Sequence, residues 1–367
     1  MQASFLLYTV FNVNNAHVYL GRISHNLTFN QQYSYTIPNN TYGVALGDFN
    51  GDSRMDLTVF SYFENCFYIF LGYGNGSFGS PKSFTTRSNP YTGIIRDFNG
   101  DSHADIAVVH LSNDSVGISL GLGNGTFLPQ SSFAVGYYPT SVSADDFNGD
   151  QRLDLLVVNY GASTVSVLRG YGNGSFASRS YFPTGLYPQL AAVADFDHDN
   201  RLDFAVSNYG TNSVDVYLGF GNGTFRAPVS YSVQFKPFGL ALGDLNSDHQ
   251  MDVVVSNCEN GTISVLLGNG NGTFLAAGYY MVGSCSTSIV MGDLNGDTYL
   301  DVVAPGSFAN YFTVLLGDGT GAFFASLSVV TDNYPMSVAV YDFDNNGGLD
   351  VVVAHAWGHL SVFMNAF

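Results

Sequence analysis

Clusters of acidic residues in this chain have the composition and spacing of a metal-binding loop. One of them, Asp48-Phe-Asn50-Gly-Asp52-Ser-Arg54-Met-Asp56, places side-chain oxygens at its first, third, fifth and ninth positions. These oxygens and the backbone carbonyl of the seventh position can converge on one point. Oxygen-only ligand sets with several carboxylates favour a hard cation, and six to eight ligands at about 2.3–2.6 Å favour Ca²⁺ over Mg²⁺. The cluster therefore predicts a calcium loop.

The cluster occurs seven times, and its first aspartate returns every 49 residues without an insertion or deletion. The predicted ligands are the side chains at positions 1, 3, 5 and 9 and the carbonyl at position 7 of each copy: Asp48, Asn50, Asp52, Arg54, Asp56; Asp97, Asn99, Asp101, His103, Asp105; Asp146, Asn148, Asp150, Arg152, Asp154; Asp195, Asp197, Asp199, Arg201, Asp203; Asp244, Asn246, Asp248, Gln250, Asp252; Asp293, Asn295, Asp297, Tyr299, Asp301; and Asp342, Asp344, Asn346, Gly348, Asp350. A single copy could be a polar turn, and paired carboxylates could in principle act as general acid and base. Seven copies in one register favour about seven Ca²⁺ ions, which by themselves account for the clustering.

The charge of the chain agrees with this interpretation. Its formal net charge is −18, and 22 of its 29 acidic residues are aspartates of the seven clusters. Seven Ca²⁺ ions would add +14 and leave about −4, so we expect metal binding to relieve repulsion and to contribute to folding. The 11 Lys and Arg residues are scattered singly, which argues against a nucleic-acid or anionic-lipid partner.

The repeat also predicts the fold. A fixed period of this length is typical of propellers and solenoids, because each copy must register against its neighbour. Residues 238–286, one full period, contain four runs rich in Val, Ile, Tyr and Phe that are bounded by Gly and Asn. Such runs predict strands joined by hairpins, and none has the periodicity of a helix. The sequence therefore predicts one all-β domain, a seven-bladed β-propeller of four-stranded antiparallel blades.

The two ends of the chain bear on how the ring closes. The last repeat ends after three predicted strands, and residues 32–38 resemble a fourth, so we expect an N-terminal strand to complete the seventh blade. Residues 30–367 then hold seven repeats, whereas residues 1–29 resemble a partial extra repeat. This surplus is open to three interpretations: a remnant of a longer array, an added edge strand, or part of an eighth blade. Residues 1–15 lack the features of a signal peptide, and no apolar run approaches the roughly 20 residues of a membrane-spanning helix.

Together, the acidic loops and a second motif resemble a known family. The second motif, Leu-Gly-x-Gly-Asn-Gly-Thr/Ser-Phe, occurs at residues 71–78, 120–127, 218–225 and 267–274. From residue 30 to the end, the chain is similar to the FG-GAP, or VCBS, repeats of integrin α-subunit propellers and related secreted proteins. The resemblance implies a seven-bladed propeller with calcium loops on one rim, and adhesion or ligand capture by the opposite face.

One position of the loops departs from the family pattern. The family loop usually has Gly at position 6, but here only Gly347 follows that rule. The other six loops have Ser53, Ser102, Gln151, Asn200, His249 and Thr298 at this position. Because Gly eases a sharp turn, we expect these six loops to bend differently or to carry strain.

The loops on the other face are rich in aromatic residues. Alternating strand directions place the acidic loops and the Gly-Asn-Gly hairpins together, and the remaining loops opposite them. The aromatic residues of those opposite loops are Tyr138, Tyr160, Tyr187, Tyr209, Phe308, Tyr311, Tyr334 and Trp357. Exposed rings would suit recognition of a protein or glycan, whereas each ring could instead pack between blades. Cys258 and Cys285 should share this face and could pair, a point that spacing leaves open, and Cys66 should then be a free thiol.

These observations predict an extracellular or cell-surface calcium-binding module for adhesion or ligand binding, either a monomer or part of a larger protein. Nine Asn-x-Ser/Thr sequons permit secretion and glycosylation. A carbohydrate-binding lectin is the first alternative, and a polysaccharide lyase is the second. Glu64 and Glu259 are the only glutamates and no catalytic constellation is recognisable, so we expect no enzymatic activity.

Overall fold

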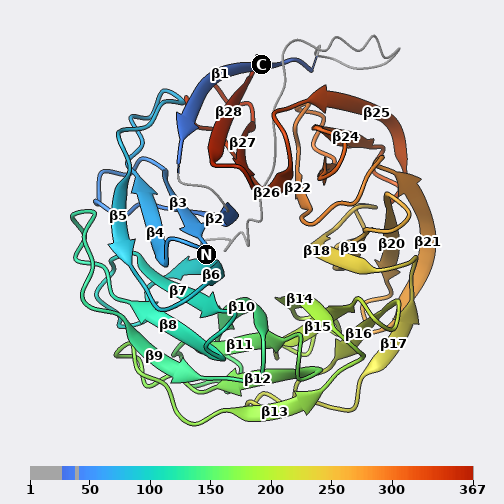
Figure 1. The fold of residues 1–367 in the computed structure, drawn as a ribbon. Helices are drawn as coiled ribbons and strands as arrows, with labels where there is room; N and C mark the ends of the chain where they lie inside the picture. Colours follow the sequence, from blue (N-terminus) through green and yellow to red (C-terminus); the bar gives the residue numbers. More distant parts are fainter. Residues whose placement is uncertain (1–26, 38–40, 367) are drawn as a thin grey trace.

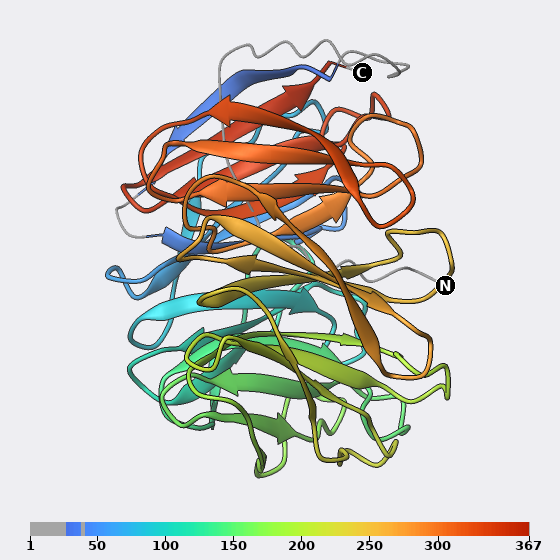
Figure 2. The same cartoon turned by 90° about the vertical axis from the view of Figure 1, so that its right-hand side faces the viewer.

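The computed structural model describes residues 27–37 and 41–366 of the chain. These residues form seven four-stranded antiparallel sheets around a central axis (Figure 1), which confirms the predicted all-β, seven-bladed propeller. Figure 2 views the ring from the side, with the loops that join the strands gathered on two opposite faces. Within the described ranges there is neither an eighth sheet nor a helix able to cross a membrane. Residues 1–26 of the predicted partial repeat lie outside the described residues.

Six blades are built from four consecutive strands each. From the inner to the outer strand they are β2 Thr41–Gly47, β3 Asp56–Ser61, β4 Cys66–Phe70 and β5 Lys82–Thr85; β6 Pro90–Arg96, β7 Asp105–His110, β8 Ser115–Ser119 and β9 Ser131–Ala134; β10 Pro139–Asp145, β11 Asp154–Asn159, β12 Thr164–Leu168 and β13 Ser180–Pro183; β14 Pro188–Ala194, β15 Asp203–Asn208, β16 Ser213–Tyr217 and β17 Val229–Ser232; β18 Pro237–Gly243, β19 Asp252–Asn257, β20 Thr262–Gly268 and β21 Phe274–Met281; and β22 Val290–Gly292, β23 Asp301–Gly306, β24 Tyr311–Gly317 and β25 Phe323–Val330.

The second strand of every blade is buried along its whole length. Neighbouring sheets pack face to face, so a strand near the middle of a blade is covered on both sides. This explains why these strands read as continuous apolar runs rather than alternating ones, as in Val253-Val254-Val255 of β19. The core of the protein therefore lies between the blades.

The seventh blade joins the two ends of the chain. Its strands are β26 Pro335–Tyr341, β27 Asp350–His355 and β28 His359–Asn365, and β1 Phe29–Thr36 completes it by pairing antiparallel with β28. An N-terminal strand thus closes the ring, and it begins at Phe29 rather than at residue 32. Phe29 is 1% exposed and its ring meets Phe312 of blade six edge-on, with centroids 5.8 Å apart. Burial of this ring explains the earlier start of the strand.

Hydrogen bonds join each blade to the next on the face of the acidic loops. In six interfaces the third glycine of a hairpin donates its N–H to the second residue of the preceding blade's acidic loop: Gly76 to Phe343, Gly125 to Phe49, Gly174 to Phe98, Gly223 to Phe147, Gly272 to Phe196 and Gly321 to Leu245. At the seventh interface Asn365 takes the place of that glycine, because its Nδ2 donates to the Leu294 carbonyl at 2.8 Å. The backbone N–H of Asn365 also donates to the Asp350 carboxylate at 2.8 Å. One side chain therefore completes the ring where the chain is interrupted.

Replacing Asn365 by Ala should weaken this closure. The substitution leaves the Leu294 carbonyl without its donor in a residue that is 0% exposed, and we expect a loss of about 1–3 kcal/mol in the free energy of unfolding. Urea denaturation at a fixed calcium concentration would measure it. The control is Asn269→Ala, which removes an exposed amide that donates to Thr273 and should change stability by less than about 0.5 kcal/mol. Equal losses in both variants would contradict the role given to Asn365.

Candidate metal centres and the opposite face

The acidic loops lie where the sequence analysis places them. Each one connects the first and second strands of its blade, beside the hairpin that connects the third and fourth, as with β2, β3 and the hairpin after β4 in blade one. Strand alternation brings both turns to the same face. The predicted ligands of all seven loops are therefore on one rim of the propeller.

The ninth residue of each loop is a fully buried aspartate. All seven of these residues are 0% exposed: Asp56, Asp105, Asp154, Asp203, Asp252, Asp301 and Asp350. In blade one, Asp56 Oδ2 accepts the N–H of Phe49 at 2.9 Å and Oδ1 accepts the N–H of Gly72 at 2.7 Å. The other six aspartates make the same pair of bonds, one to the loop and one to the segment that follows the third strand. Each carboxylate thus ties an acidic loop to the hairpin beside it or, in blade seven, to Asn365 at the end of β28.

Burial leaves these carboxylates short of compensating charge. Loss of water raises the pKa of Asp56 and Asp203 to about 6, and that of Asp301 and Asp350 to about 7, although two backbone N–H groups act against the rise. The other acidic groups of each loop raise these pKa values further. A cation at the loop would offset this unfavourable burial of negative charge.

The first residue of each loop shapes the turn around itself. In blade one, Asp48 Oδ1 accepts the N–H of Gly51 at 2.7 Å and Oδ2 accepts the N–H of Ser53 at 2.8 Å. In all seven loops the residue at position 6 donates in this way and has a left-handed backbone: Ser53, Ser102, Gln151, Asn200, His249, Thr298 and Gly347, with φ between 61° and 94°. The six loops without glycine therefore bend as the glycine loop does, and their position 6 residues carry the strain of that conformation.

Two loops bring three carboxylates together. Asp195, Asp197 and Asp203 in blade four each place one oxygen within 4.8 Å of the other two, as do the corresponding aspartates of blade seven, Asp342, Asp344 and Asp350. These are positions 1, 3 and 9. Within the part of the chain that the structure describes, no other loop groups three carboxylates this closely. The other five have Asn at position 3, which supplies an amide oxygen instead of a carboxylate.

The convergent loops fit a hard divalent cation. Their donors are oxygens only, and Asp197 Oδ1 is buried without a hydrogen-bond partner in the described structure. An unpaired buried carboxylate oxygen is costly unless a cation or donor meets it. Asp199, at position 5, lies outside this group and pairs with Arg201.

The remaining predicted ligands are held by one another. Position 5 carboxylates also pair with the side chain of position 7 in blades one to three: Arg54 with Asp52 at 3.8 Å, His103 with Asp101 at 3.3 Å and Arg152 with Asp150 at 3.9 Å. In four loops the position 3 amide donates to the position 5 carboxylate: Asn50 to Asp52, Asn99 to Asp101, Asn246 to Asp248 and Asn295 to Asp297. Asn148 instead donates to Asp154 at 2.8 Å. The carbonyls of position 7 stay predicted ligands.

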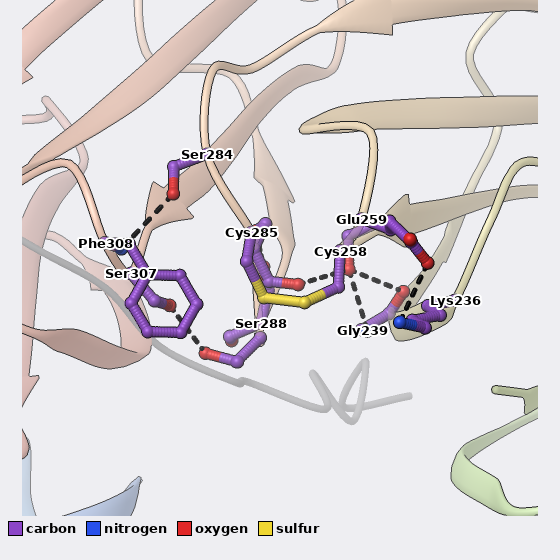
Figure 3. The surroundings of a disulfide bond; sticks show 12 residues. Lys236, Gly239, Cys258, Glu259, Ser284, Cys285, Ser288, Ser307 and Phe308 are labelled. Atoms are coloured by element: carbon purple, nitrogen blue, oxygen red, sulfur yellow. Dashed lines mark hydrogen bonds and ion pairs between the residues drawn. A yellow bond between two sulfur atoms is a disulfide. The ribbon is translucent and has the colours of Figure 1, made fainter.

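A disulfide lies on the opposite face (Figure 3). It joins Cys258, just after β19 of blade five, to Cys285 at the entry to blade six. The pairing left open by the sequence is therefore present, and Cys66 is free and buried. Beside the disulfide, Lys236 and Glu259 form an ion pair at 2.8 Å. The disulfide anchors the segment that precedes β22. Strand β22 has three residues, whereas most inner strands have seven.

Aromatic side chains line a depression on this same face, which we call the tyrosine funnel. It has a volume of about 630 Å³, and its defining residues come from blades two to five: Tyr91, Tyr137, Tyr138, Tyr160, Tyr187, Gln189, Tyr209 and Phe238. The rings of Tyr160 and Tyr187 stack with centroids 5.0 Å apart. Four of the predicted aromatic residues thus lie in one depression, with Tyr187 47% exposed.

The other predicted rings lie elsewhere. Phe308, Tyr334 and Trp357 form a separate exposed cluster over blades six and seven, with centroid distances of 6.2 Å and 5.7 Å along the series, and Tyr311 is half-buried. The sequence analysis missed Tyr91, Tyr137, Gln189 and Phe238 of the funnel. A signal exists for Tyr91, Gln189 and Phe238, because each stands six residues before the first aspartate of an acidic loop.

Comparisons with known proteins agree with the fold. The FG-GAP repeat profile matches residues 40–80, and the FG-GAP-like repeat profile matches residues 97–157, 146–206, 195–255, 244–304 and 293–353. No curated protein sequence matches the chain.

Solved structures with low sequence identity share the architecture. A lectin from Agrocybe aegerita, described for its recognition of non-reducing terminal N-acetylglucosamine, has a TM-score of 0.60 at 17% identity, covering 99% of this chain and 96% of its own. The periplasmic gluconolactonase PpgL of Pseudomonas aeruginosa has a TM-score of 0.63 at 15% identity, covering 89% and 97%. BBS1N, crystallised in complex with ARL6DN, has a TM-score of 0.65 at 13% identity, and the match covers 92% of this chain and 96% of BBS1N.

At such identities these structures are similar in fold alone, whereas the repeat profiles cover most of the chain in the register of its 49-residue period. The profile matches begin and end so that each includes at least one acidic loop. This chain belongs to the FG-GAP repeat family.

Proposed function

We propose that the chain is an extracellular, non-enzymatic binding module in which Ca²⁺ ions stabilise one face and the opposite face binds a protein or glycan. The observation that carries the proposal is the set of seven buried position 9 carboxylates, none of which forms an ion pair with a Lys, Arg or His of the described residues. The disulfide between Cys258 and Cys285 supports an oxidising, extracellular location.

The side chains at positions 1, 3 and 9 would hold the ion in each loop. When bound, Ca²⁺ supplies positive charge at the point where the chain gathers carboxylates. The position 9 carboxylate already contacts both the loop and the hairpin, so fixing it in place stiffens both turns. Because each hairpin also donates to the preceding blade's loop, stiffening one blade supports the next. Calcium in this role is a structural ion.

The opposite face is the proposed recognition surface. Its loops carry exposed aromatic side chains, among them Phe308 at 72% and Trp357 at 57% exposure, whereas loops on the other rim are occupied by acidic clusters. Exposed large rings supply contact area with little loss of conformational freedom. A lectin is the second candidate, favoured by the tyrosine funnel. A lyase has less support, since Glu259 is engaged by Lys236 and no catalytic constellation accompanies it within residues 27–37 and 41–366.

Calcium titration tests the metal sites. Calorimetry of chelator-treated protein should detect about seven ions and a large rise in melting temperature, because the ion binds only the folded state. Asp344→Asn gives blade seven the Asn that five other loops have at position 3, so it should keep its ion with roughly tenfold weaker affinity. Asp342→Asn, which also disturbs the turn, should lose one ion. Uptake of few ions, with an unchanged melting temperature, would refute calcium as the structural ion.

The pH dependence of stability should reverse sign when calcium is added. In the chelated protein, burial raises the pKa of six position 9 carboxyls to about 6 or about 7 and also raises that of Asp154, against about 3.9 when unfolded. The folded state then binds protons that the unfolded state does not, so stability should rise as pH falls from 7 to 5.5. Burial lowers the pKa of His110 to about 4 and that of His355 to about 3, so these two side chains favour the unfolded state as pH falls. The seven position 9 carboxyls outnumber them, so we expect the net effect to be a gain in stability.

In saturating calcium the same acidification should lower stability, because protons compete with the ion for the carboxylates. Melting temperatures followed by circular dichroism across this pH range, with calcium and with chelator, measure both slopes. Parallel slopes in the two conditions would show that the buried carboxylates and the ion are not linked.

A further inference from the structure

The tyrosine funnel has the form of a pocket that is closed at its base. Inner-strand residues from all seven blades surround the central channel beneath it, leaving a cavity of only about 30 Å³. Tyr91, Thr140, Gln189 and Phe238 line both spaces. A ligand would therefore insert its terminal group from the open side of the funnel, and it would not pass through the centre of the propeller. The volume of about 630 Å³ is in the range of small-ligand sites.

The backbone does not explain why tyrosines stand at the rim of the funnel. Tyr138 and Tyr187 have φ of 59° and 55° and precede the first prolines of β10 and β14. Left-handed backbone is unfavourable for a bulky residue. The equivalent residue of blade two is Asn89, with φ of 57°, a type that tolerates this conformation well. Asparagine would thus satisfy the turn, whereas tyrosine adds a ring to the funnel.

The polar groups of the funnel are neutral. Among the residues that the structure describes, no Asp, Glu, Lys or Arg lines it, in a chain whose net charge is −18. Burial raises the pKa of the Tyr91 and Tyr160 hydroxyls, which keeps them protonated. Gln189 is 7% exposed and lines the funnel. A carboxamide in the lining of a pocket can offer two donors and an acceptor to a polar ligand or to water.

We propose that the tyrosine funnel binds the uncharged terminal sugar of a glycan, with the apolar face of the sugar against Tyr160 or Tyr187 and its hydroxyls on the Gln189 carboxamide. This inference rests on the proposed function, in which this face carries recognition. A sugar combines a flat apolar face with several hydroxyls, and the funnel combines exposed ring faces with neutral donors and acceptors. The absence of lining charge disfavours sialylated or sulfated termini, which would need a cation to pair with.

The test uses the calcium-loaded full chain on an array of immobilised neutral and sialylated oligosaccharides, followed by calorimetry with the neutral oligosaccharide that binds best. Tyr187→Asn removes a stacking ring but fits the backbone, as Asn89 shows, and Gln189→Met removes the amide at similar volume. Each should weaken binding at least about tenfold. The control is Tyr279→Asn, which removes an exposed tyrosine ring from the outer strand β21, away from the funnel and from the Phe308, Tyr334 and Trp357 cluster, and it should bind as the parent protein does.

Melting temperature and calcium uptake keep the variants interpretable. Both should be unchanged in Tyr187→Asn, or the melting temperature should rise as backbone strain is relieved. Absence of glycan binding with normal calcium uptake would overturn this inference and leave the metal part of the proposed function standing. Binding only to sialylated termini, or an equal loss of binding in Tyr279→Asn, would also overturn it. So would displacement of the oligosaccharide by a polyproline peptide that itself binds more tightly, because the aromatic funnel would then be a peptide site.

Discussion

Seven buried carboxylates, one in each blade, are the constraint on which the rest of the structure depends. Each position 9 aspartate is removed from water and receives two backbone N–H groups, as Asp56 does from Phe49 and Gly72, and Asp154 alone is given a side-chain amide as well. Those two bonds fix the acidic loop against the hairpin of the same blade. The charge left uncompensated by them makes the rim unfavourable without a cation, and this is why the proposed calcium ions belong to the fold rather than to catalysis.

The two faces of the propeller differ in how strictly their contacts repeat from blade to blade. On the rim of the acidic loops, the contacts repeat in every blade, and even the chain break is bridged because Asn365 reproduces the bond of a hairpin glycine. On the opposite face no such repeat is imposed, so the equivalent loops differ: tyrosines in blades three and four, an ion pair and disulfide at blade five, and Trp357 in blade seven. Variation is tolerated there because the fold is held elsewhere, as expected for a recognition surface on a rigid scaffold.

The sequence predicted most of the fold because its period was unbroken. Strand content, blade number, closure and the shared face of loop and hairpin all follow from spacing. Spacing also places Cys258 and Cys285 on one face, but it leaves open the pairing that the structure shows. What spacing could not reveal depends on backbone conformation and on contacts between blades. Ser53 and its equivalents retain the left-handed turn because the Asp48 carboxylate accepts their N–H. Gln189 was missed because the funnel exists only where four blades meet.

The most direct test of calcium as the structural ion is hydrogen–deuterium exchange of the full chain with calcium and with chelator, read by mass spectrometry of peptides from both faces. The account predicts slower exchange with calcium in the acidic loops and adjoining hairpins of every blade, such as residues 48–56 and 71–79, and little change in the funnel loops around residues 136–139 and 185–188. Unchanged exchange in the acidic loops, or calcium protection confined to the opposite face, would contradict it.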